Sequence, residues 1–388
     1  MPAALPARDR LLTAPVTANV DEQTRRLLAD LRAGRPRALA RALSWVECGA
    51  PQAQPLLEAV YAEPPPSWVI GLTGVGGAGK STLVPHLARR LADQRGRVAV
   101  LAVDPSSPLT GGALLGDRIR DASGEPHPRV SFRSVASRGG QGGLATCVAD
   151  LVRVAAAAGH DTVIIETIGA GQSELGILQV AHSVVLVQAP GLGDDVQAQK
   201  AGVMEVADLL VVNKADQPGS EDTQESLRQA LRLCVRSHHL QDGVNESPDG
   251  TLSWHPPVLP TVALAGQGIE ALCDWLGRHR EYLQRSGRRA ALDEAHGQRR
   301  LESHLQQLVQ QRVRQRIRLS LPAQTGQGVH RPASPGDDAA GGLAAGGHPW
   351  RNPLALAREW ADAILPDLDE SRINPGGLDA ASTRGDTR

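Results

Sequence analysis

The chain has 388 residues, with 41 Lys and Arg residues against 42 Asp and Glu residues and a formal net charge of −1 at pH 7. This length suits one domain of ordinary size with additional elements, because domains usually span roughly 100 to 200 residues. The balanced charge excludes a general electrostatic attraction to nucleic acid or to an anionic membrane, so we expect neither as a partner.

The cysteines indicate a reducing compartment. They lie far apart, form no C-x-x-C pair, and predict neither a disulfide framework nor a zinc site. No apolar run approaches the roughly 20 residues that span a bilayer, and the first 20 residues lack the apolar segment of a secretory signal. We therefore expect a cytoplasmic protein with a disordered N-terminus. The four cysteines are Cys48, Cys147, Cys234 and Cys273.

Residues 21–62 are predicted to be helical, because leucine and alanine recur at helical spacing with arginines on the opposite face. The sequence PPPS at 64–67 ends this region. Short apolar runs then alternate with glycine-rich or helical segments. These runs are the predicted strands, at 68–73, 97–103, 161–166, 183–188, 208–213 and 257–262.

The predicted strands are apolar along their whole length, which indicates strands buried on both faces. The fold class is therefore α/β, with a mostly parallel central sheet covered by helices. Ligands of such sheets bind beyond the carboxyl ends of the strands. Every motif described below follows or ends one of these runs.

The C-terminal part is predicted to contain four segments of different structure. Residues 273–317 are rich in Gln and Arg and favour helix, whereas 322–348 have the low complexity of a flexible linker. A short amphipathic helix is expected at 352–366, and the last twenty residues are polar and predicted to be disordered.

The segment GVGGAGKS at 74–81 matches the phosphate-binding P-loop pattern G-x-x-x-x-G-K-[ST] between a strand and a helix. Its glycines let backbone N–H groups turn toward phosphates, the lysine reaches the β and γ oxygens, and the serine hydroxyl suits Mg²⁺. We expect a nucleotide, which the segment described next indicates to be GTP or GDP, to contact Gly74, Gly76, Gly77, Ala78, Gly79, Lys80, Ser81 and Thr82, with Lys80 also catalytic.

The segment VVNKAD at 211–216 predicts guanine recognition. The carboxylate of Asp216 can accept hydrogen bonds from N1–H and the 2-amino group of guanine, whereas N1 of adenine is an acceptor that would repel it. Asn213 can bond the loop or the base, and the stem of Lys214 can lie over the base. The motif favours GTP over ATP.

Three acidic residues between the two motifs are candidates for Mg²⁺ and its waters, together with Ser81. Asp104 follows one strand, Glu166 ends another, and Asp117 lies in GGALLGDR. Hard oxygen ligands suit Mg²⁺, which retains several waters and uses few carboxylates.

Lysine occurs only three times, at Lys80, Lys200 and Lys214, in a chain that otherwise uses arginine. The two cations are not interchangeable at a shaped site. Lys200 lies in APGLGDDVQAQK and is predicted to neutralise charge during phosphoryl transfer. This loop, with the glycine-rich stretches at 137–143 and 166–174, could close on GTP and relax after hydrolysis.

Several strings together resemble the MeaB/ArgK-type GTPases, the methylmalonyl-CoA mutase-associated group. They are VDPSSPLTGGALLGDR, SRGGQGG, IIETIGAGQSE, PGLGDDVQAQKAGVMEVADLLVVNKAD and WHPPVL, and the likeness covers roughly residues 21–320. The resemblance implies a homodimeric GTPase that serves an adenosylcobalamin-dependent acyl-CoA mutase, gating cofactor loading and protecting or rescuing the mutase. It assigns Ser81, Asp104, Asp117 and Glu166 magnesium and switch roles, and Lys200 the role of a switch lysine engaged by the partner.

The resemblance also identifies a guanine loop at Val262 and Ala263, where the family has Ser-Ala and backbone contacts are expected. We expect an N-terminal helical extension at 1–65, a GTPase domain at 66–282, a C-terminal helical arm at 283–321 and a flexible low-complexity tail with a short helix at 322–388. The resemblance implies that the arm serves dimerisation, whereas the glycine-rich tail departs from the family pattern. Two alternatives stay open. One is a kinase for a small molecule or a transport protein, although no acceptor pocket is readable. The other is a nickel-insertion GTPase, which would need Cys or His pairs at metal spacing that the sequence lacks.

Overall fold

The structure is a computed structural model that describes residues 22–62, 68–105, 127–137, 143–167, 180–192, 206–234, 242–247 and 249–320. The chain divides into two compact units, Met1–Leu321 and Pro322–Arg388, and every described residue belongs to the first. Asp117, Lys200, most of the three predicted mobile loops and the C-terminal tail lie outside the described residues. For Asp104 the backbone is described and the side chain is not.

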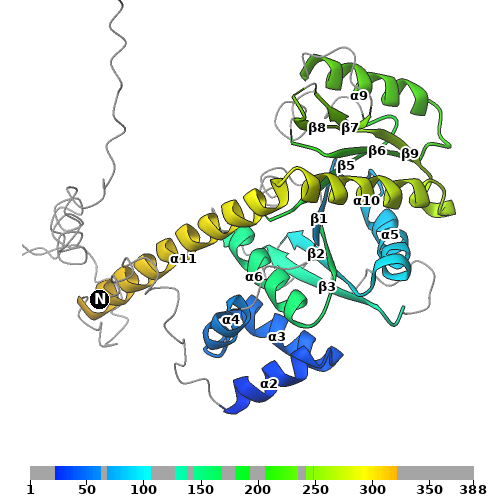
Figure 1. Ribbon diagram of the computed structural model, residues 1–388. Coiled ribbons are helices and arrows are strands. Elements are labelled where there is room, and N and C mark those ends of the chain that lie inside the picture. Colours follow the sequence, from blue (N-terminus) through cyan, green and yellow to red (C-terminus); the bar gives the residue numbers. More distant parts are fainter. Residues whose placement is uncertain are drawn as a thin grey trace, which may run out of the picture. The chain divides into compact units, whose positions relative to one another are not determined.

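Seven strands among the described residues form one sheet, in the order β3-β2-β4-β1-β5-β6-β9. All neighbouring pairs in this sheet are parallel, which confirms the predicted α/β class. Figure 1 shows the sheet with helices on both of its faces. The strands are β1 (Trp68–Thr73), β2 (Val98–Pro105), β3 (Val130–Ser137), β4 (Thr162–Thr167), β5 (Ser183–Gln188), β6 (Leu209–Asn213) and β9 (Val258–Thr261).

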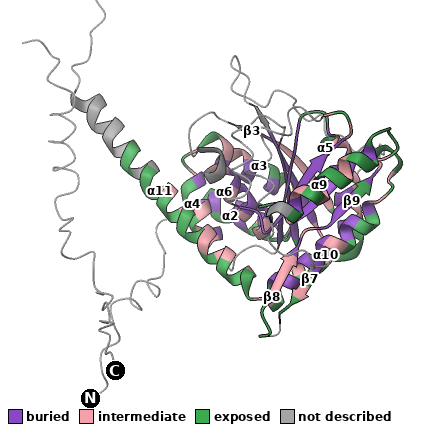
Figure 2. Ribbon diagram, turned by 90° about the horizontal axis from the view of Figure 1, so that it is seen from above, coloured by how far each residue is buried: buried purple, intermediate pink, exposed green. Residues whose placement is uncertain are grey.

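Alternate residues of the central strands bury opposite faces of the sheet. Trp68, Ile70 and Leu72 of β1 pack in the cluster formed with α5 (Lys80–Arg95) and α10 (Ile269–Arg285). Val69 packs in the other cluster, with α6 (Gly143–Ala157) and the N-terminal helices. A smaller cluster lies under α9 (Ser220–Cys234). Burial on both faces explains why these strands lack polar alternation, as the buried central strands in Figure 2 illustrate.

The N-terminal region that the apolar spacing predicts to be helical comprises three helices. They are α2 (Glu22–Arg32), α3 (Pro36–Cys48) and α4 (Ala53–Tyr61). Gly34 and Gly49 adopt positive φ angles of 68° and 63°, and such left-handed residues terminate helices. The apolar spacing located the helical residues correctly and missed these breaks.

The region predicted to be helical at 273–317 comprises parts of two helices, α10 and α11 (Arg288–Ser320), which are separated at Gly287 with φ 72°. Helix α10 packs on α5, whereas α11 extends beyond the sheet (Figure 1). A bidentate ion pair anchors α11, because Arg300 donates to both carboxylate oxygens of Asp150 on α6 at 2.8 and 2.7 Å. Tyr61 donates to the same carboxylate at 2.9 Å, so the N-terminal helices, α6 and α11 meet at one buried network.

Three strands were not predicted. Edge strand β3 mixes apolar and polar residues and is half-buried at most positions whose burial is described, so it lacks the continuous apolar pattern of a central strand. Strands β7 (Gly243–Glu246) and β8 (Leu252–His255) form a short antiparallel hairpin beside α10. Neither strand has the continuous apolar run from which the central strands were predicted.

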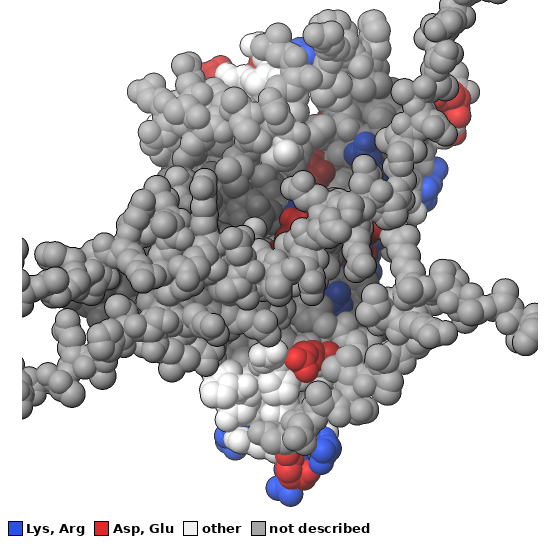
Figure 3. Space-filling model, turned by 90° about the vertical axis from the view of Figure 1, so that its left-hand side faces the viewer, with Lys and Arg blue, Asp and Glu red and all other residues white. Residues whose placement is uncertain are grey.

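Charged side chains of both signs are interspersed on the described part of the face in Figure 3. This mixed pattern agrees with the balanced composition. Of the helices that the structure describes, none combines the length and apolar character that crossing a bilayer requires.

Candidate nucleotide site

The predicted phosphate loop joins β1 to α5 at the carboxyl edge of the sheet. Gly79 begins the helix with φ 87°, and its carbonyl accepts from the amides of Thr82 and Leu83 at 3.1 and 3.0 Å. The first N–H groups of a helix have no partner within the helix and carry partial positive charge. An anion is therefore favoured at this position.

Lys80 is 6% exposed, and its ammonium group folds back over the loop. Its Nζ donates to the carbonyl oxygens of Gly74 and Val75, the latter at 3.0 Å. These contacts hold a buried cation beside the loop, where phosphate oxygens would be stronger acceptors than carbonyl oxygens.

Ser81 and Glu166 meet beside the phosphate loop. Ser81 Oγ donates to Glu166 Oε1 at 2.5 Å, and Glu166 is fully buried at the end of β4. Asp104 lies on the neighbouring strand β2, two residues beyond Ala102, which pairs with Glu166. A hydroxyl and a buried carboxylate are hard oxygen donors, so the described part of this donor set fits Mg²⁺.

Asn213 connects the phosphate loop with the predicted guanine loop. Its Nδ2 donates to the carbonyl of Ala78 at 2.9 Å. Its Oδ1 accepts from the backbone N–H of Ala263 at 3.0 Å and from Thr261 Oγ1 at 3.2 Å. One buried amide therefore holds three segments together. Sequence reasoning missed Thr261, whose only signal is its position at the end of a strand run.

The other residues of the guanine motif lie close to Asn213 in the sequence. Lys214 is half-buried and has φ 57°, a left-handed conformation that is uncommon outside glycine and often accompanies function. Asp216 is exposed and Val262 is half-buried. The amide of Ala215 donates to the carbonyl of Thr261 at 3.0 Å, which holds the two loops side by side at the carboxyl edge.

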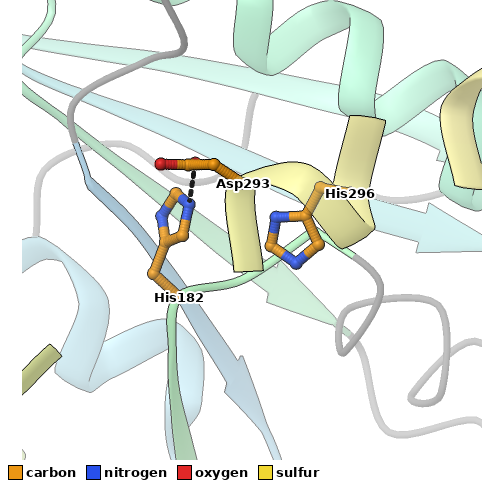
Figure 4. Close-up of side chains that lie close together, drawn as sticks. All are labelled: His182, Asp293 and His296. Atoms are coloured by element: carbon orange, nitrogen blue, oxygen red, sulfur yellow. Dashed lines mark hydrogen bonds and ion pairs between the residues drawn. The ribbon is translucent and has the colours of Figure 1, made fainter. Parts of the chain in front are cut away.

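A second cluster lies at the amino edge of the sheet, where His182, Asp293 and His296 place nitrogen and oxygen atoms within 4.8 Å of one another. Figure 4 shows His182 and Asp293 joined while His296 lies beside them. These residues are far apart in sequence, so their proximity could not be recognised from the spacing of Cys and His residues along the chain.

Hydrogen bonding argues against a metal role for this cluster. His182 Nδ1 accepts from the backbone N–H of Val69 at 2.9 Å, so the ring proton is on Nε2, which donates to Asp293 at 3.0 Å. A metal-binding histidine needs its proton on the nitrogen that does not bind the metal. For Nε2 of His182 to bind a metal, the ring proton would have to move to Nδ1. There it would face the backbone N–H of Val69, which is itself a donor.

Burial controls the protonation of this cluster. It lowers the pKa of His182, and it lowers the pKa of His296 to about 4 with help from nearby positive charge. Burial alone would raise the pKa of Asp293, but hydrogen bonds from His182 and Arg289 outweigh it and lower the pKa to about 2. The cluster therefore joins the beginning of β5 to α11 through a neutral histidine and a charged carboxylate.

Comparison with known proteins places the chain in a family. The profile described as "Methylmalonyl Co-A mutase-associated GTPase MeaB" matches residues 39–320. A putative GTPase of Pyrococcus abyssi is 44% identical over 262 residues, which are 68% of this chain and 78% of the relative. The fused isobutyryl-CoA mutase of Geobacillus kaustophilus is 39% identical over 244 residues, 60% of this chain and 22% of that protein.

A crystal structure named LAO/AO transport system kinase superposes with a TM-score of 0.57 at 28% identity, covering 78% of this chain and 89% of the other. The family match spans the phosphate loop, the acidic residues, the guanine motif and all of α11. The chain belongs to the methylmalonyl-CoA mutase-associated GTPases of the MeaB type, and it is a guanine-nucleotide-binding P-loop GTPase.

Proposed function

We propose that this GTPase is a chaperone of an adenosylcobalamin-dependent acyl-CoA mutase, gating cofactor loading and protecting or reactivating the enzyme in the cytoplasm. The observation that carries the proposal is the fused isobutyryl-CoA mutase, in which a region 39% identical to this chain belongs to one polypeptide named for the mutase. A GTPase domain linked covalently to a mutase in one protein favours a non-covalent partnership of the same kind in another.

In this proposal the phosphates of GTP lie along residues 74–82. The ammonium of Lys80 leaves the carbonyl oxygens of its own loop and binds the β- and γ-phosphates. Asn213, Lys214 and Asp216 recognise guanine, and the backbone at Val262 and Ala263 closes the base pocket. Ser81, Asp104, Asp117 and Glu166 would hold Mg²⁺, which neutralises phosphate charge when bound.

The role of Lys200 is the most specific part of this proposal. Its loop also carries Asp194 and Asp195, which would oppose a nucleotide, so we expect the mutase to bring Lys200 toward the phosphates. A partner can complete a GTPase site in this way. Mutase-stimulated hydrolysis should then depend on Lys200 more than basal hydrolysis does.

The experiment measures GTP turnover of wild type and Lys200→Ala with and without purified mutase. Lys80→Ala serves as the control that loses both activities. Stimulation by the mutase in wild type and its loss in Lys200→Ala support the proposal. Equal stimulation of both proteins would remove Lys200 from the mechanism, and the absence of binding to any acyl-CoA mutase would reject the chaperone role.

The likeness to a protein named as a transport system kinase favours one alternative, a kinase for a transport protein. That reaction would move the γ-phosphoryl group to a protein side chain instead of to water. Labelled GTP distinguishes the two, because a kinase leaves label on protein and a GTPase releases it as phosphate. We rank nickel insertion lower, since the His182 cluster has the wrong proton arrangement for a metal ligand.

A further inference from the structure

Three buried polar side chains at the carboxyl edge have no role in the site described above. Thr73, Thr167 and Gln188 end β1, β4 and β5, and they are 0%, 1% and 6% exposed. Their atoms Thr73 Oγ1, Thr167 Oγ1 and Gln188 Oε1 have no hydrogen-bond partner among the described residues. A buried polar atom without a partner destabilises a fold, so each such atom requires an explanation.

The strand register places the three residues together. Leu72 pairs with Glu166, so Thr73 and Thr167, which come next, are neighbours on β1 and β4. Thr73 also pairs with Leu186 of β5, and Gln188 lies two residues further along the same face. Because side chains alternate along strands, these three share the sheet face opposite Glu166.

This group lies directly beneath the start of the phosphate loop. Gly74 follows Thr73, and a Cβ atom on Gly74 would come within 2.0 Å of the carbonyl oxygen of Val187, the residue before Gln188. The loop therefore packs on the end of β5 that carries this amide. Polar atoms here are close to the phosphate-binding backbone without being part of it.

We propose that Thr73, Thr167 and Gln188 are positioning residues for GTP hydrolysis, whose polar atoms bind a water molecule that reaches the γ-phosphate side of the bound nucleotide. The inference rests on the proposed placement of the phosphates along residues 74–82. Three oxygen atoms from adjacent strands supply the two to four polar partners that an ordered buried water needs. The fold then tolerates unpaired groups in the absence of GTP because they are used in the hydrolysing state.

Thr162 offers a matched control on the same strand as Thr167. It begins β4, is fully buried, and its Oγ1 also lacks a hydrogen-bond partner among the described residues. It lies at the amino edge, remote from the phosphate loop. Substituting valine for either threonine removes one unpaired hydroxyl and keeps the branched shape.

The experiment compares Thr167→Val, Thr167→Ser and Thr162→Val in the full-length protein without any mutase. For each variant it measures kcat and KM for GTP, the dissociation constant of a non-hydrolysable GTP analogue, and the melting temperature. We expect Thr167→Val to melt at or above the wild-type temperature while kcat falls roughly 3- to 10-fold, the loss of one neutral hydrogen bond. Analogue binding should stay unchanged, Thr167→Ser should retain kcat, and Thr162→Val should gain stability with wild-type kcat.

Equal kcat values for Thr167→Val, Thr162→Val and wild type would overturn the inference, because the Thr167 hydroxyl would then have no role in hydrolysis. Weaker analogue binding in Thr167→Val, with no separate effect on kcat, would also overturn it by showing a role in affinity. Gln188→Met keeps the side-chain length and removes the amide, so it should also lower kcat while analogue binding stays unchanged. None of these measurements involves a mutase, so they are independent of the proposed chaperone role.

Discussion

Nδ2 of Asn213 occupies the space where a side chain on Gly79 would begin, since a Cβ atom on Gly79 would lie 2.3 Å from it. The same nitrogen donates to the carbonyl of Ala78. The phosphate loop and the guanine motif are therefore fitted together at a residue without a side chain. We therefore expect phosphate binding and base recognition to be coupled through this contact.

Gly79→Ala should weaken GTP binding at least tenfold, because the new methyl group must displace Asn213 and break its buried bonds to Ala78 and Ala263. Gly77→Ala is the control, since Gly77 also has a positive φ of 78° but a Cβ atom there meets nothing within 4 Å. Titration calorimetry with GTP compares the two. Equal losses would mean that backbone strain, and not the Asn213 contact, determines the effect.

Asp216→Ala should reduce GTP affinity roughly 10²- to 10⁴-fold, since two charge-assisted bonds at about 1.5 to 3 kcal/mol each are lost. Asp216→Asn should instead prefer xanthine nucleotides, because its amide can donate to the additional carbonyl. Competition between GTP, XTP and ATP measures this directly. Wild-type protein that bound ATP as tightly as GTP would contradict the assignment.

Local patterns predicted six of the strands, and they placed the predicted phosphate loop and guanine motif at strand ends, as the structure has them, because in each case contiguous residues carry the signal. The strand ends are correct to within two residues, as for β2, expected at 97–103 and found at Val98–Pro105. Helix breaks were not predicted, although Gly34, Gly49 and Gly287 mark them with positive φ angles. Amphipathic spacing continues across such breaks when both helices cover the same core.

Relationships across the fold could not be predicted from neighbouring residues. The bond between Thr261 and Asn213 joins β9 to β6, and the approach of His182 to Asp293 joins β5 to α11. Each depends on sheet order and helix placement, which one sequence does not supply. The alignment of Thr73 with Thr167 similarly requires the β1–β4 register.

His296 should make the protein less stable in acid. Its pKa is about 4 when folded against an ordinary 6.5, so between these values the unfolded chain binds a proton that the folded protein does not. The contribution of His296 to the free energy of unfolding is therefore fully present above pH 6.5 and is lost as the pH decreases toward 4. At pH 5 the loss is at most about 2 kcal/mol, and solvent screening of this part-exposed ring reduces it.

Urea unfolding of wild type and His296→Gln at pH 7.5 and pH 5.0 tests this expectation. The variant should lose less stability between the two pH values, while the remaining decrease reflects His182 and His160, whose pKa values burial also lowers. Identical decreases in both proteins would show that His296 takes up its proton in the folded state at its ordinary pKa.

Helix α11 presents an exposed apolar stripe, and we predict that it pairs with α11 of a second copy. Leu301, Leu305 and Val309 are 60%, 52% and 43% exposed at a spacing of four residues, which places them on one helix face. Figure 2 shows much of the described part of this helix as exposed. Although Arg300 of α11 pairs with Asp150 of α6, these three side chains are exposed and available to a partner.

Leu305→Glu should convert a dimer into a monomer, because a carboxylate in the centre of the paired stripes would be buried without a partner. Gln306→Glu places the same charge on the adjacent exposed position and should leave the dimer intact. Light scattering after size exclusion, over a range of protein concentrations, gives the mass of each variant. Basal GTP turnover should be equal in both variants, because neither residue is near the phosphate loop. A Leu305→Glu protein that stayed dimeric at low concentration would exclude the stripe as the interface, and a monomeric wild type would exclude the dimer itself.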